Sequence, residues 1–380
     1  MMSDVLIVPR LRVKEVKDSL SHDGHFDNTK KIISVSRDHY AVAITTAGKE
    51  ALLGGCVPDG CALSEQVLPS VNPVNPHHVM QDNLHKLLPR QPSHGLPRHW
   101  IKHGDLVVLP SNSFSGPEWD DLISPELWGC VATSLGAKRL AREDHVINDN
   151  YRTPSCELLL GNDGWVGHID NKVCYVFDVT KNMFCHGNIT EKIRLSRLPY
   201  RDDEVVLDMF AGIGYFTLPL LVHTPVSRVH SCDWSADAIT ALHKGLVANQ
   251  VTERCITHHV DCRKLRLPEP VDRVILGLIP SSQSGYETAC HHANTKTGTW
   301  MHVHGVVNSK PVTMDTTVTK RQCWYRWAGQ VMTEIKELLT TLHPMMSWSV
   351  VISHVEHVKS YAPRLDHIVV DVHCVPSVLS

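Results

Sequence analysis

The stretch VVLDMFAGIGYFTLPL, from Val205 to Leu220, decides the fold. Its apolar start predicts a buried strand that ends at Asp208, and its glycines predict a turn into a helix. Gly212 and Gly214 have no Cβ, so the backbone can approach a ligand closely at the carboxyl end of this strand. The pattern indicates a nucleotide site at the edge of an open α/β sheet.

Strands and helices alternate after residue 200, which predicts a parallel, doubly wound sheet. The second strand is expected at Ser227–Asp233, and CITHH, DRVILGL and TWMHVHGVV supply three more. A long helix is expected from Cys323 to about Leu342, before SWSVVISH and DHIVVDVHCV. Only KSYAPRL separates these last two runs, so we expect an antiparallel hairpin. Five strand–helix units and a terminal hairpin are the Rossmann-like, seven-stranded layout of class I S-adenosylmethionine-dependent transferases.

Residues 96–195 predict a small α+β module directly before this sheet. DLVVLP, CELLLG, GWVGHIDN and VCYVFDVT are the expected strands, and Glu126–Arg142 is expected to form an amphipathic helix. The residues before 96 are expected to form a variable N-terminal module that ends in a Pro- and His-rich connector. We therefore expect three parts, 1–95, 96–195 and 196–380.

The glycine loop favours S-adenosylmethionine over a dinucleotide. A dinucleotide fingerprint needs a third glycine to seat a pyrophosphate, and Thr217 occupies that position. Asp208 at the head of the loop suits a ligand with an amino group. Asp233 ends the second strand, where it can bind ribose hydroxyls, and Asp261 with Cys262 follows the third strand, where an adenine edge would lie. An NAD site and an empty Rossmann-like domain are the alternatives.

Composition narrows the class of protein. The 380 residues carry a formal net charge of −3, so the whole chain gives no argument for nucleic-acid binding. The 12 cysteines include no C-x-x-C pair and the histidines are dispersed, so we expect reduced thiols and no metal site. The sequence has no signal-peptide pattern and no apolar run long enough for a bilayer, so we expect a cytoplasmic protein that is not embedded in a membrane.

Three motifs, MFCHGNITEKIR, DMFAGIGYF and LGLIPSS, carry a resemblance to a known family. The chain resembles the wybutosine-synthesising 3-amino-3-carboxypropyltransferases, which are relatives of the tRNA guanine-37 N1-methyltransferases. The resemblance covers most of the chain, from LPRHWIKHGDLVVLP to VKSYAPRLDHIVVDV, and is weak before it. It implies S-adenosylmethionine as the group donor and the anticodon loop of phenylalanine tRNA as the partner.

The resemblance also implies which residues contact the cofactor. It places contacts at Cys185 and Lys192, before the sheet, and at Asp233, Asp261 and Cys262. Three of these positions depart from the residues expected there, because Cys185 stands for serine, Asp233 for glutamate and Cys262 for asparagine. Asp233 keeps the carboxylate on a shorter arm, and the two thiols are weaker hydrogen-bonding groups.

The segment DRVILGLIPSSQSGY distinguishes two reactions. Enzymes that methylate base nitrogens usually carry Asn or Asp beside proline after the fourth strand, and this side chain accepts a hydrogen bond from the target nitrogen. Leu278 occupies the position here, which argues against nitrogen methylation. The resemblance then implies transfer of the 3-amino-3-carboxypropyl group to C7 of 4-demethylwyosine at position 37, with release of 5′-methylthioadenosine. A tRNA guanine-37 N1-methyltransferase and a catalytically inactive tRNA-binding homologue are the alternatives.

Further residues are candidates for the substrate. Arg152, Ser281 and Ser282 are candidates for binding it, although the two serines equally fit the end of a strand. A tRNA surface is expected where basic residues cluster, at Lys138, Arg139, Arg142, Arg152, Lys181, Lys192, Arg194, Arg197 and Arg201. His302 and His304 are interpreted as structural, and no catalytic base is identified. The sequence does not give the oligomeric state, and a monomer is one option.

Overall fold

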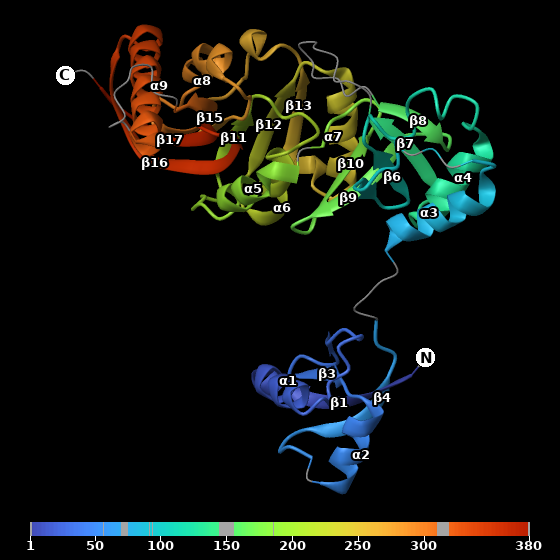
Figure 1. Cartoon of the computed structure of the whole chain (residues 1–380). Coiled ribbons are helices and arrows are strands. Elements are labelled where there is room, and N and C mark those ends of the chain that lie inside the picture. Colours follow the sequence, from blue (N-terminus) through green and yellow to red (C-terminus); the bar gives the residue numbers. More distant parts are fainter. Residues whose placement is uncertain are drawn as a thin grey trace. The chain divides into compact units, whose positions relative to one another are not determined.

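The structure is a computed structural model that describes residues 2–55, 57–69, 75–90, 92, 94–143, 156–184, 186–309 and 319–378. The chain divides into two compact units, Met1–Pro89 and Arg90–Ser380, and both are drawn in Figure 1. Among the described residues, no helix is long and apolar enough to cross a membrane. The division of the second unit at residue 195 stays a prediction.

The first unit contains a four-stranded sheet in the order β2-β3-β1-β4, in which every pairing is antiparallel. Its strands and helices are β1 (Ser3–Pro9), α1 (Val13–His22), β2 (Ile33–Ser34), β3 (His39–Ala43), α2 (Thr46–Gly54), β4 (Ala62–Gln66) and α3 (Pro76–Leu87). Leu6, Val8 and Val42 on the sheet pack with Val16 and Leu20 of α1 in a core of its own. Alternate residues of each strand can face this core because side chains alternate across a sheet.

The second unit opens with a four-stranded sheet, in the order β5-β6-β7-β8, and a two-stranded hairpin. These elements are β5 (Ile101–His103), β6 (Leu106–Leu109), α4 (Pro125–Ser134), β7 (Arg139–Glu143), β8 (Cys156–Leu160), β9 (Trp165–Asp170) and β10 (Val173–Asp178). The four strands expected in this region are confirmed.

The helix expected over Glu126–Arg142 is wrong in its second half. α4 ends at Ser134, and Gly136 then adopts a positive φ of 63° that an L side chain rarely accepts. The chain returns as β7, where Leu140 and Ala141 are buried beside β6. The apolar spacing of this stretch suits a helix, but residues 139–143 form a strand because they pair with β6 and β8.

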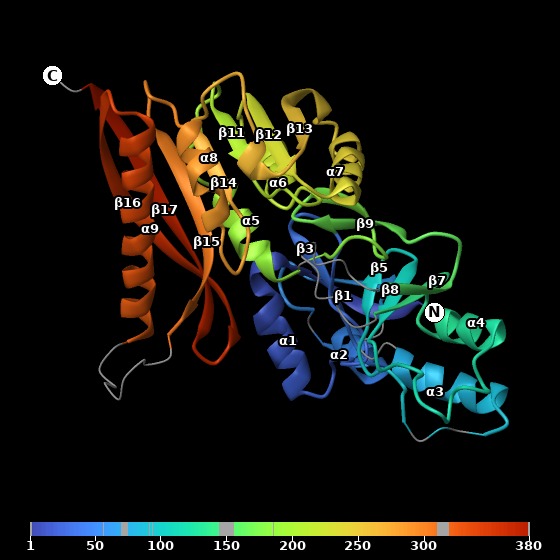
Figure 2. The same cartoon turned by 90° about the horizontal axis from the view of Figure 1, so that it is seen from above.

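The main sheet has seven strands in the order β13-β12-β11-β14-β15-β17-β16, which confirms the expected fold class. The strands are β11 (Val205–Asp208), β12 (Arg228–Asp233), β13 (Cys255–His259), β14 (Arg273–Leu276), β15 (Thr299–Asn308), β16 (Met346–Ala362) and β17 (Leu365–Val378). The first five are parallel, and β17 is antiparallel to both β15 and β16. Figure 2 shows the sheet from above, with β16 and β17 at one edge.

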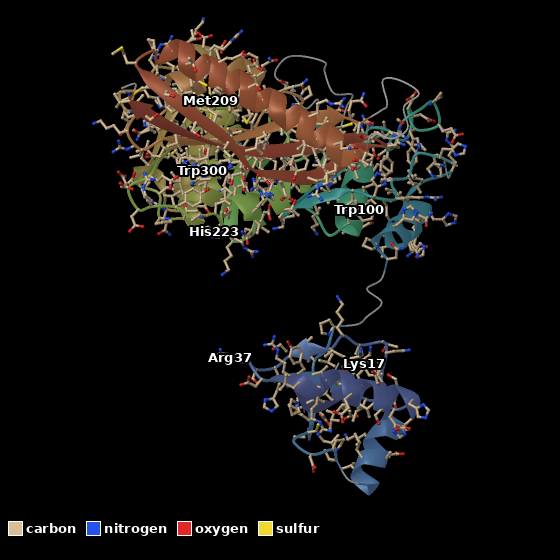
Figure 3. All side chains as sticks on the ribbon, turned by 90° about the vertical axis from the view of Figure 1, so that its left-hand side faces the viewer. Lys17, Arg37, Trp100, Met209, His223 and Trp300 are labelled. Atoms are coloured by element: carbon tan, nitrogen blue, oxygen red, sulfur yellow. The ribbon has the colours of Figure 1, made fainter. Side chains whose placement is uncertain are left out.

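Helices cover both faces of this sheet (Figure 1). One face carries α5 (Ile189–Leu195), α6 (Thr217–His223) and α7 (Ala236–Ala248), and the other carries α8 (Tyr286–His291) and α9 (Lys320–Leu342). Figure 3 draws the side chains, with Met209 after β11 and Trp300 on β15 labelled.

Two details of the expected main domain are wrong. The third strand has no α-helix after it, because residues 255–276, all described, contain only the single 3₁₀ turn Cys262–Lys264 between β13 and β14. The terminal strands are also longer than expected. Most of KSYAPRL belongs to β16 and β17, and the turn between them is short because Arg364 adopts a positive φ of 65°.

The β9–β10 hairpin belongs to the same core as the main sheet. Its Val166, Tyr175 and Phe177 are buried with residues of β11, α6 and α7. Asn249, at the end of α7, donates to the carbonyl of Cys174 at 2.7 Å and accepts its backbone N–H at 2.9 Å. The hairpin is therefore held against the sheet unit on the side of α7, where it can contribute to a site at the strand ends.

Candidate cofactor site

Three acidic residues lie at the carboxyl ends of three adjacent strands. Asp208 is the last residue of β11, Asp233 is the last residue of β12, and Asp261 follows β13. Because these strands are parallel neighbours, their carboxyl ends meet at one edge of the sheet. The fold brings together the strand-end acids that the sequence placed in register, at the edge where open α/β sheets bind ligands.

The loop after β11 requires glycine at both expected positions. Gly212 and Gly214 adopt φ values of 55° and 96°, in the left-handed region. A Cβ at Gly212 would lie 3.0 Å from the ring of Tyr215, and one at Gly214 would lie 2.7 Å from Leu218. The loop is therefore compact. Because Gly212 has no Cβ, a neighbouring group can approach its backbone closely.

Asp233 ties this loop to the next strand. Its Oδ2 accepts the backbone N–H of Gly212 at 2.8 Å, and its Oδ1 accepts that of Ser235 at 2.9 Å. Burial raises the pKa of this carboxyl. Each oxygen of a carboxylate accepts about two hydrogen bonds, so acceptor capacity remains for the hydroxyls of a ribose.

Asp208 is fully buried, so it does not present its carboxylate openly to a ligand. Its Oδ2 accepts the hydroxyl of Thr217 at 2.8 Å and the backbone N–H of the same residue at 3.2 Å. Within the described residues, its Oδ1 is buried without a hydrogen-bond partner. Burial raises the pKa of Asp208 to about 7. One oxygen therefore fixes the start of α6, and the other is open to a further donor.

Asp261 and Cys262 form the start of the 3₁₀ turn after β13. The Asp261 carboxylate accepts the backbone N–H of Arg263 at 3.0 Å and pairs with the Arg263 guanidinium, which is exposed. Cys262 is 8 % exposed, and burial raises the pKa of its thiol to about 11. The thiol is thus neutral and packs in the core, so a ligand would meet the Asp261 side chain and the backbone of this turn.

Lys192 lies in α5 and is buried, with its side chain 3 % exposed. Its Nζ donates to Asp170 Oδ2 at 2.5 Å and stands over the rings of Tyr175 and Phe184 at 4.7 and 5.2 Å. The Tyr175 hydroxyl donates to the carbonyl of Tyr215, in the glycine loop, at 3.3 Å. Asp170 therefore already balances the charge of Lys192, beside the loop that the cofactor would occupy.

Sequence reasoning missed Asp170. It ends β9 as one acidic residue in an Asp-Asn turn, and its role depends on a contact with a lysine 22 positions away. An apolar hairpin that ends in an acidic residue gives no local signal for that contact.

The segment after β14 lies against the end of β15. The backbone N–H of Val306 donates to the carbonyl of Pro280 at 2.8 Å, and Ser281 forms a bridge with Gly305. Ser282 is fully buried, and its hydroxyl donates to the carbonyl of His304 at 3.1 Å. Ser282 thus holds two strand ends together, whereas Ser281 is exposed. Leu278, at the position of the missing amide, is half-buried.

Two of the candidate residues, Cys185 and Arg152, lie outside the described residues. Metal binding has no support within the described part of the chain, where no group of three or more His, Cys, Asp or Glu side chains could hold an ion. His302 agrees with its structural interpretation, since its Nδ1 bonds Asp371 at 2.7 Å and its Nε2 bonds Arg273 at 2.8 Å.

The expected basic surface is partly internal. Arg139 pairs with Asp105 and Asp163, Arg142 pairs with Glu157, and Arg194 pairs with Glu191 and Asp371. Together with the buried Lys192, these cations hold the protein together. Four cations of the cluster are exposed, namely Lys138, Lys181, Arg197 and Arg201.

These residues fit S-adenosylmethionine. The strand-end carboxylate of Asp233 suits a ribose, the Asp261 turn suits an adenine edge, and the buried Oδ1 of Asp208 keeps unused acceptor capacity. The glycine loop adds a close backbone approach without the third glycine that a pyrophosphate needs. A sulfonium ligand with one adenosine group therefore fits the site better than a dinucleotide.

Comparison with known proteins identifies the family. Residues 167–324 match the model of the TRM5/TYW2 methyltransferase domain, and residues 80–164 match that of the TYW2 N-terminal domain. The tRNA wybutosine-synthesizing protein 2 homolog of Bos taurus is 43% identical in an alignment of 316 residues that covers 74% of this chain and 72% of that protein.

Solved structures agree with this assignment. The crystal structure of Pyrococcus horikoshii TYW2 in complex with MeSAdo is 25% identical, with a TM-score of 0.58, over 79% of this chain and 99% of that one. The complex of aTrm5 and tRNALeu shares the fold, with a TM-score of 0.56 and 18% identity over 97% of this chain and 99% of that one. The chain belongs to the family of tRNA wybutosine-synthesizing protein 2 and is a tRNA-modifying, S-adenosylmethionine-dependent transferase.

Proposed function

We propose that this protein transfers the 3-amino-3-carboxypropyl group of S-adenosylmethionine to C7 of 4-demethylwyosine at position 37 of phenylalanine tRNA. The small-molecule product is 5′-methylthioadenosine. The observation that carries the proposal is Leu278, an apolar side chain where base-nitrogen methyltransferases place an amide or carboxylate. The MeSAdo in the complex of the related TYW2 is the product that this transfer releases.

The choice of nucleophile follows from Leu278. A guanine N1 must lose a proton as it attacks, and a side-chain acceptor beside it favours that loss. An electron-rich ring carbon attacks through its π electrons and needs no such acceptor at the same place. An apolar residue beside the base is therefore compatible with carbon alkylation and unfavourable for nitrogen methylation.

The protein's own residues would bind and align the donor. Asp233 would hold the ribose hydroxyls, and Asp261 with the backbone of Cys262 would hold the adenine edge. Lys192, which lies beside the glycine loop and is balanced by Asp170, would face the carboxylate of the amino acid group. Bound S-adenosylmethionine supplies an electrophilic carbon next to its sulfonium. Alignment of this carbon with C7 is the main catalytic contribution that we assign to the site.

The exposed cations Lys138, Lys181, Arg197 and Arg201 are our proposed contacts to tRNA phosphates. Such contacts position an RNA, and the modified base must leave its stack to reach the strand ends. We propose that the reaction takes place in the cytoplasm. We also propose three parts of the chain: residues 1–95 form an accessory module, 96–195 form a module next to the cofactor, and 196–380 form the transferase domain.

A double-label experiment tests the proposed reaction. The protein is incubated with S-adenosylmethionine labelled in either the methyl or the carboxyl carbon, and with tRNA carrying either guanine or 4-demethylwyosine at position 37. We expect carboxyl label to enter only the 4-demethylwyosine tRNA. Methyl label on guanine-37 would replace the proposal with the methyltransferase alternative. Bound tRNA without any label transfer would identify an inactive homologue.

A further inference from the structure

Two buried histidines form a hydrogen-bonded pair across β15 and β17. His304 Nδ1 and His367 Nε2 are 3.0 Å apart, and the side chains are 1 % and 0 % exposed. The residues are 63 positions apart in the chain, and the antiparallel pairing of β15 with β17 brings them together. The two rings make one continuous unit with a nitrogen at each outer end.

Both outer nitrogens lack a partner. Within the described residues, His304 Nε2 and His367 Nδ1 are buried and make no hydrogen bond. A neutral imidazole has one donor and one acceptor, so the pair offers a free acceptor at one end and a free donor at the other. Buried polar atoms are normally satisfied, since leaving one unpaired costs stability. His302, two residues earlier on β15, has both nitrogens bonded, so the open ends are particular to this pair.

His304 lies beside two segments that we assign to the proposed site. The carbonyl of His304 accepts the hydroxyl of Ser282, and the next residue, Gly305, forms a bridge with Ser281. The His304 ring centroid is 5.0 Å from that of Phe216, which follows the glycine loop. His304 therefore contacts the segment after β14 through its backbone and the residue after the glycine loop through its ring.

The surroundings keep both rings neutral. Burial lowers the pKa of His304, and the pKa of His367 falls to about 4 through burial and the neighbouring Lys359 and His357. Arg194 lowers the pKa of His304 further, and Asp371 opposes this effect. A neutral imidazole at physiological pH has a lone pair that can accept a proton.

We propose that His304 Nε2 accepts the proton that C7 loses during transfer and that His367 relays it outward. The inference rests on the proposed function. The new carbon–carbon bond forms as the carbon–sulfur bond breaks, and the electron pair of that bond goes to sulfur. The C7–H electron pair then returns to the ring, and the proton passes to His304 Nε2. The Nδ1 proton of His304 moves to His367 Nε2, and the Nδ1 proton of His367 passes to a water molecule, which must reach this buried nitrogen during turnover. Each ring then ends as its other neutral tautomer.

Two substitutions separate the relay from a packing role. In His304→Asn the amide can replace Nδ1 and keep the bond to His367, but the outer nitrogen is removed. In His367→Gln the amide can replace Nε2 and keep the bond to His304, and again only the outer nitrogen is lost. A packing role predicts near-normal rates for both variants, whereas the relay predicts that both are slow. His373→Asn is the matched control, because His373 lies on the same strand but stacks on Trp300 at the far end of β15.

The measurement is single-turnover transfer of carboxyl label to 4-demethylwyosine tRNA that carries hydrogen or deuterium at C7. We expect His304→Asn to slow transfer by about 100-fold, at the lower end for loss of a general base, with unchanged affinity for S-adenosylmethionine and tRNA. We also expect its rate to become sensitive to deuterium at C7. Should His304→Asn not fold, His367→Gln decides by the same readout.

The outcomes distinguish this inference from the proposed function. Rates within twofold of the unsubstituted protein for folded His304→Asn or His367→Gln would overturn the relay and leave the proposed function standing. No transfer of carboxyl label by the unsubstituted protein would overturn both. Slow variants with deuterium sensitivity, beside a normal His373→Asn, would support the relay.

Discussion

The carboxylate of Asp233 accepts the backbone N–H of Gly212 at 2.8 Å, although the two residues are 21 positions apart. This hydrogen bond joins the end of β12 to the glycine loop after β11, so one side chain both shapes the loop and faces the proposed ribose position. A shorter acid than the glutamate that the resemblance implies at this position can serve here because the loop comes close to it. Its two contacts to backbone N–H groups also fix the direction in which the carboxylate points.

Replacing Asp233 with Ala should lower the affinity for S-adenosylmethionine at least tenfold. Hydrogen bonds to a charged acceptor are each worth about 1.5–3 kcal/mol, and a tenfold change in affinity corresponds to about 1.4 kcal/mol. Titration calorimetry measures the affinity, and Asp203→Ala, at an exposed acid before the amino end of β11 and opposite the carboxyl ends of the strands, is the control. Equal affinity in the folded Asp233→Ala variant would remove this residue from the site.

Substitutions of Lys192 and Asp170 should distinguish a role of Lys192 in stability from a role in cofactor binding. Asp170→Asn leaves a buried lysine without its partner, which typically costs about 3–5 kcal/mol. Adding Lys192→Met removes the uncompensated charge and should restore most of the free energy of unfolding. If Lys192 faces the cofactor carboxylate, the restored double variant still binds S-adenosylmethionine weakly.

Denaturant unfolding and calorimetry on the three proteins provide both readouts. Asp203→Asn, which breaks an exposed pair with Arg201, should change stability little and is the control. A double variant that regains both stability and affinity would show that Lys192 serves packing alone.

Asp208 should make the protein less stable as the pH rises from about 4 to about 7. Below this range the carboxyl is protonated in both states. Within it the carboxyl is ionised only in the unfolded chain, because burial raises the pKa of the folded form from 3.8 to about 7. Stability from this group is thus complete at low pH and is lost as the pH approaches the folded pKa.

Asp208→Asn tests this linkage, because the amide is neutral throughout. From about pH 4 to about pH 7 the variant should become more stable relative to the unsubstituted protein. Above that range the difference in their free energies of unfolding should stay constant. Denaturant unfolding at several pH values measures it, and parallel pH profiles would contradict the raised pKa.

The sequence predicts those parts of the site that local patterns determine. The run from Val205 to Leu220 predicts a strand, a turn and a helix because its apolar residues and glycines act within one neighbourhood. Asp233 and Asp261 follow from the same rule, since each ends or follows an apolar run. The parallel sheet with a terminal antiparallel hairpin also follows, because alternating strands and helices admit few arrangements, whereas the order of the seven strands is not predicted.

Contacts between distant residues could not be predicted. Arg139 appears in the sequence as a member of a basic cluster, yet it pairs with Asp105 and Asp163, which precede it by 34 and follow it by 24 positions. The stretch from Arg139 to Glu143 looks helical until a neighbouring strand pairs with it. Such outcomes depend on tertiary neighbours, which override local propensity.

Lys138 and Arg139 should therefore behave differently, although they are adjacent. Lys138 is exposed, and Lys138→Ala should reduce the salt dependence of tRNA binding by about one unit of slope with little effect on stability. Arg139→Ala breaks hydrogen bonds to two carboxylates and to the Trp165 carbonyl, and it should lower the free energy of unfolding by about 1–3 kcal/mol. Filter binding over a salt series and thermal unfolding measure the two effects. A shallower salt slope for Arg139→Ala alone would return Arg139 to the RNA surface.

The last prediction concerns Leu278 and the choice of transferred group. Leu278→Asn restores the amide that nitrogen methyltransferases carry, yet it should not convert the enzyme. The group transferred is the sulfonium carbon that stands in line with the nucleophile, and one amide beside the base does not rotate the donor. We expect Leu278→Asn to release no S-adenosylhomocysteine with guanine-37 tRNA and to keep producing 5′-methylthioadenosine with 4-demethylwyosine tRNA at a reduced rate.

Leu278→Ala, which shortens the side chain without adding an acceptor, is the control for lost packing. Chromatography of the two nucleoside products gives the ratio directly. Formation of S-adenosylhomocysteine by Leu278→Asn, but not by Leu278→Ala, would show that this single position selects the reaction.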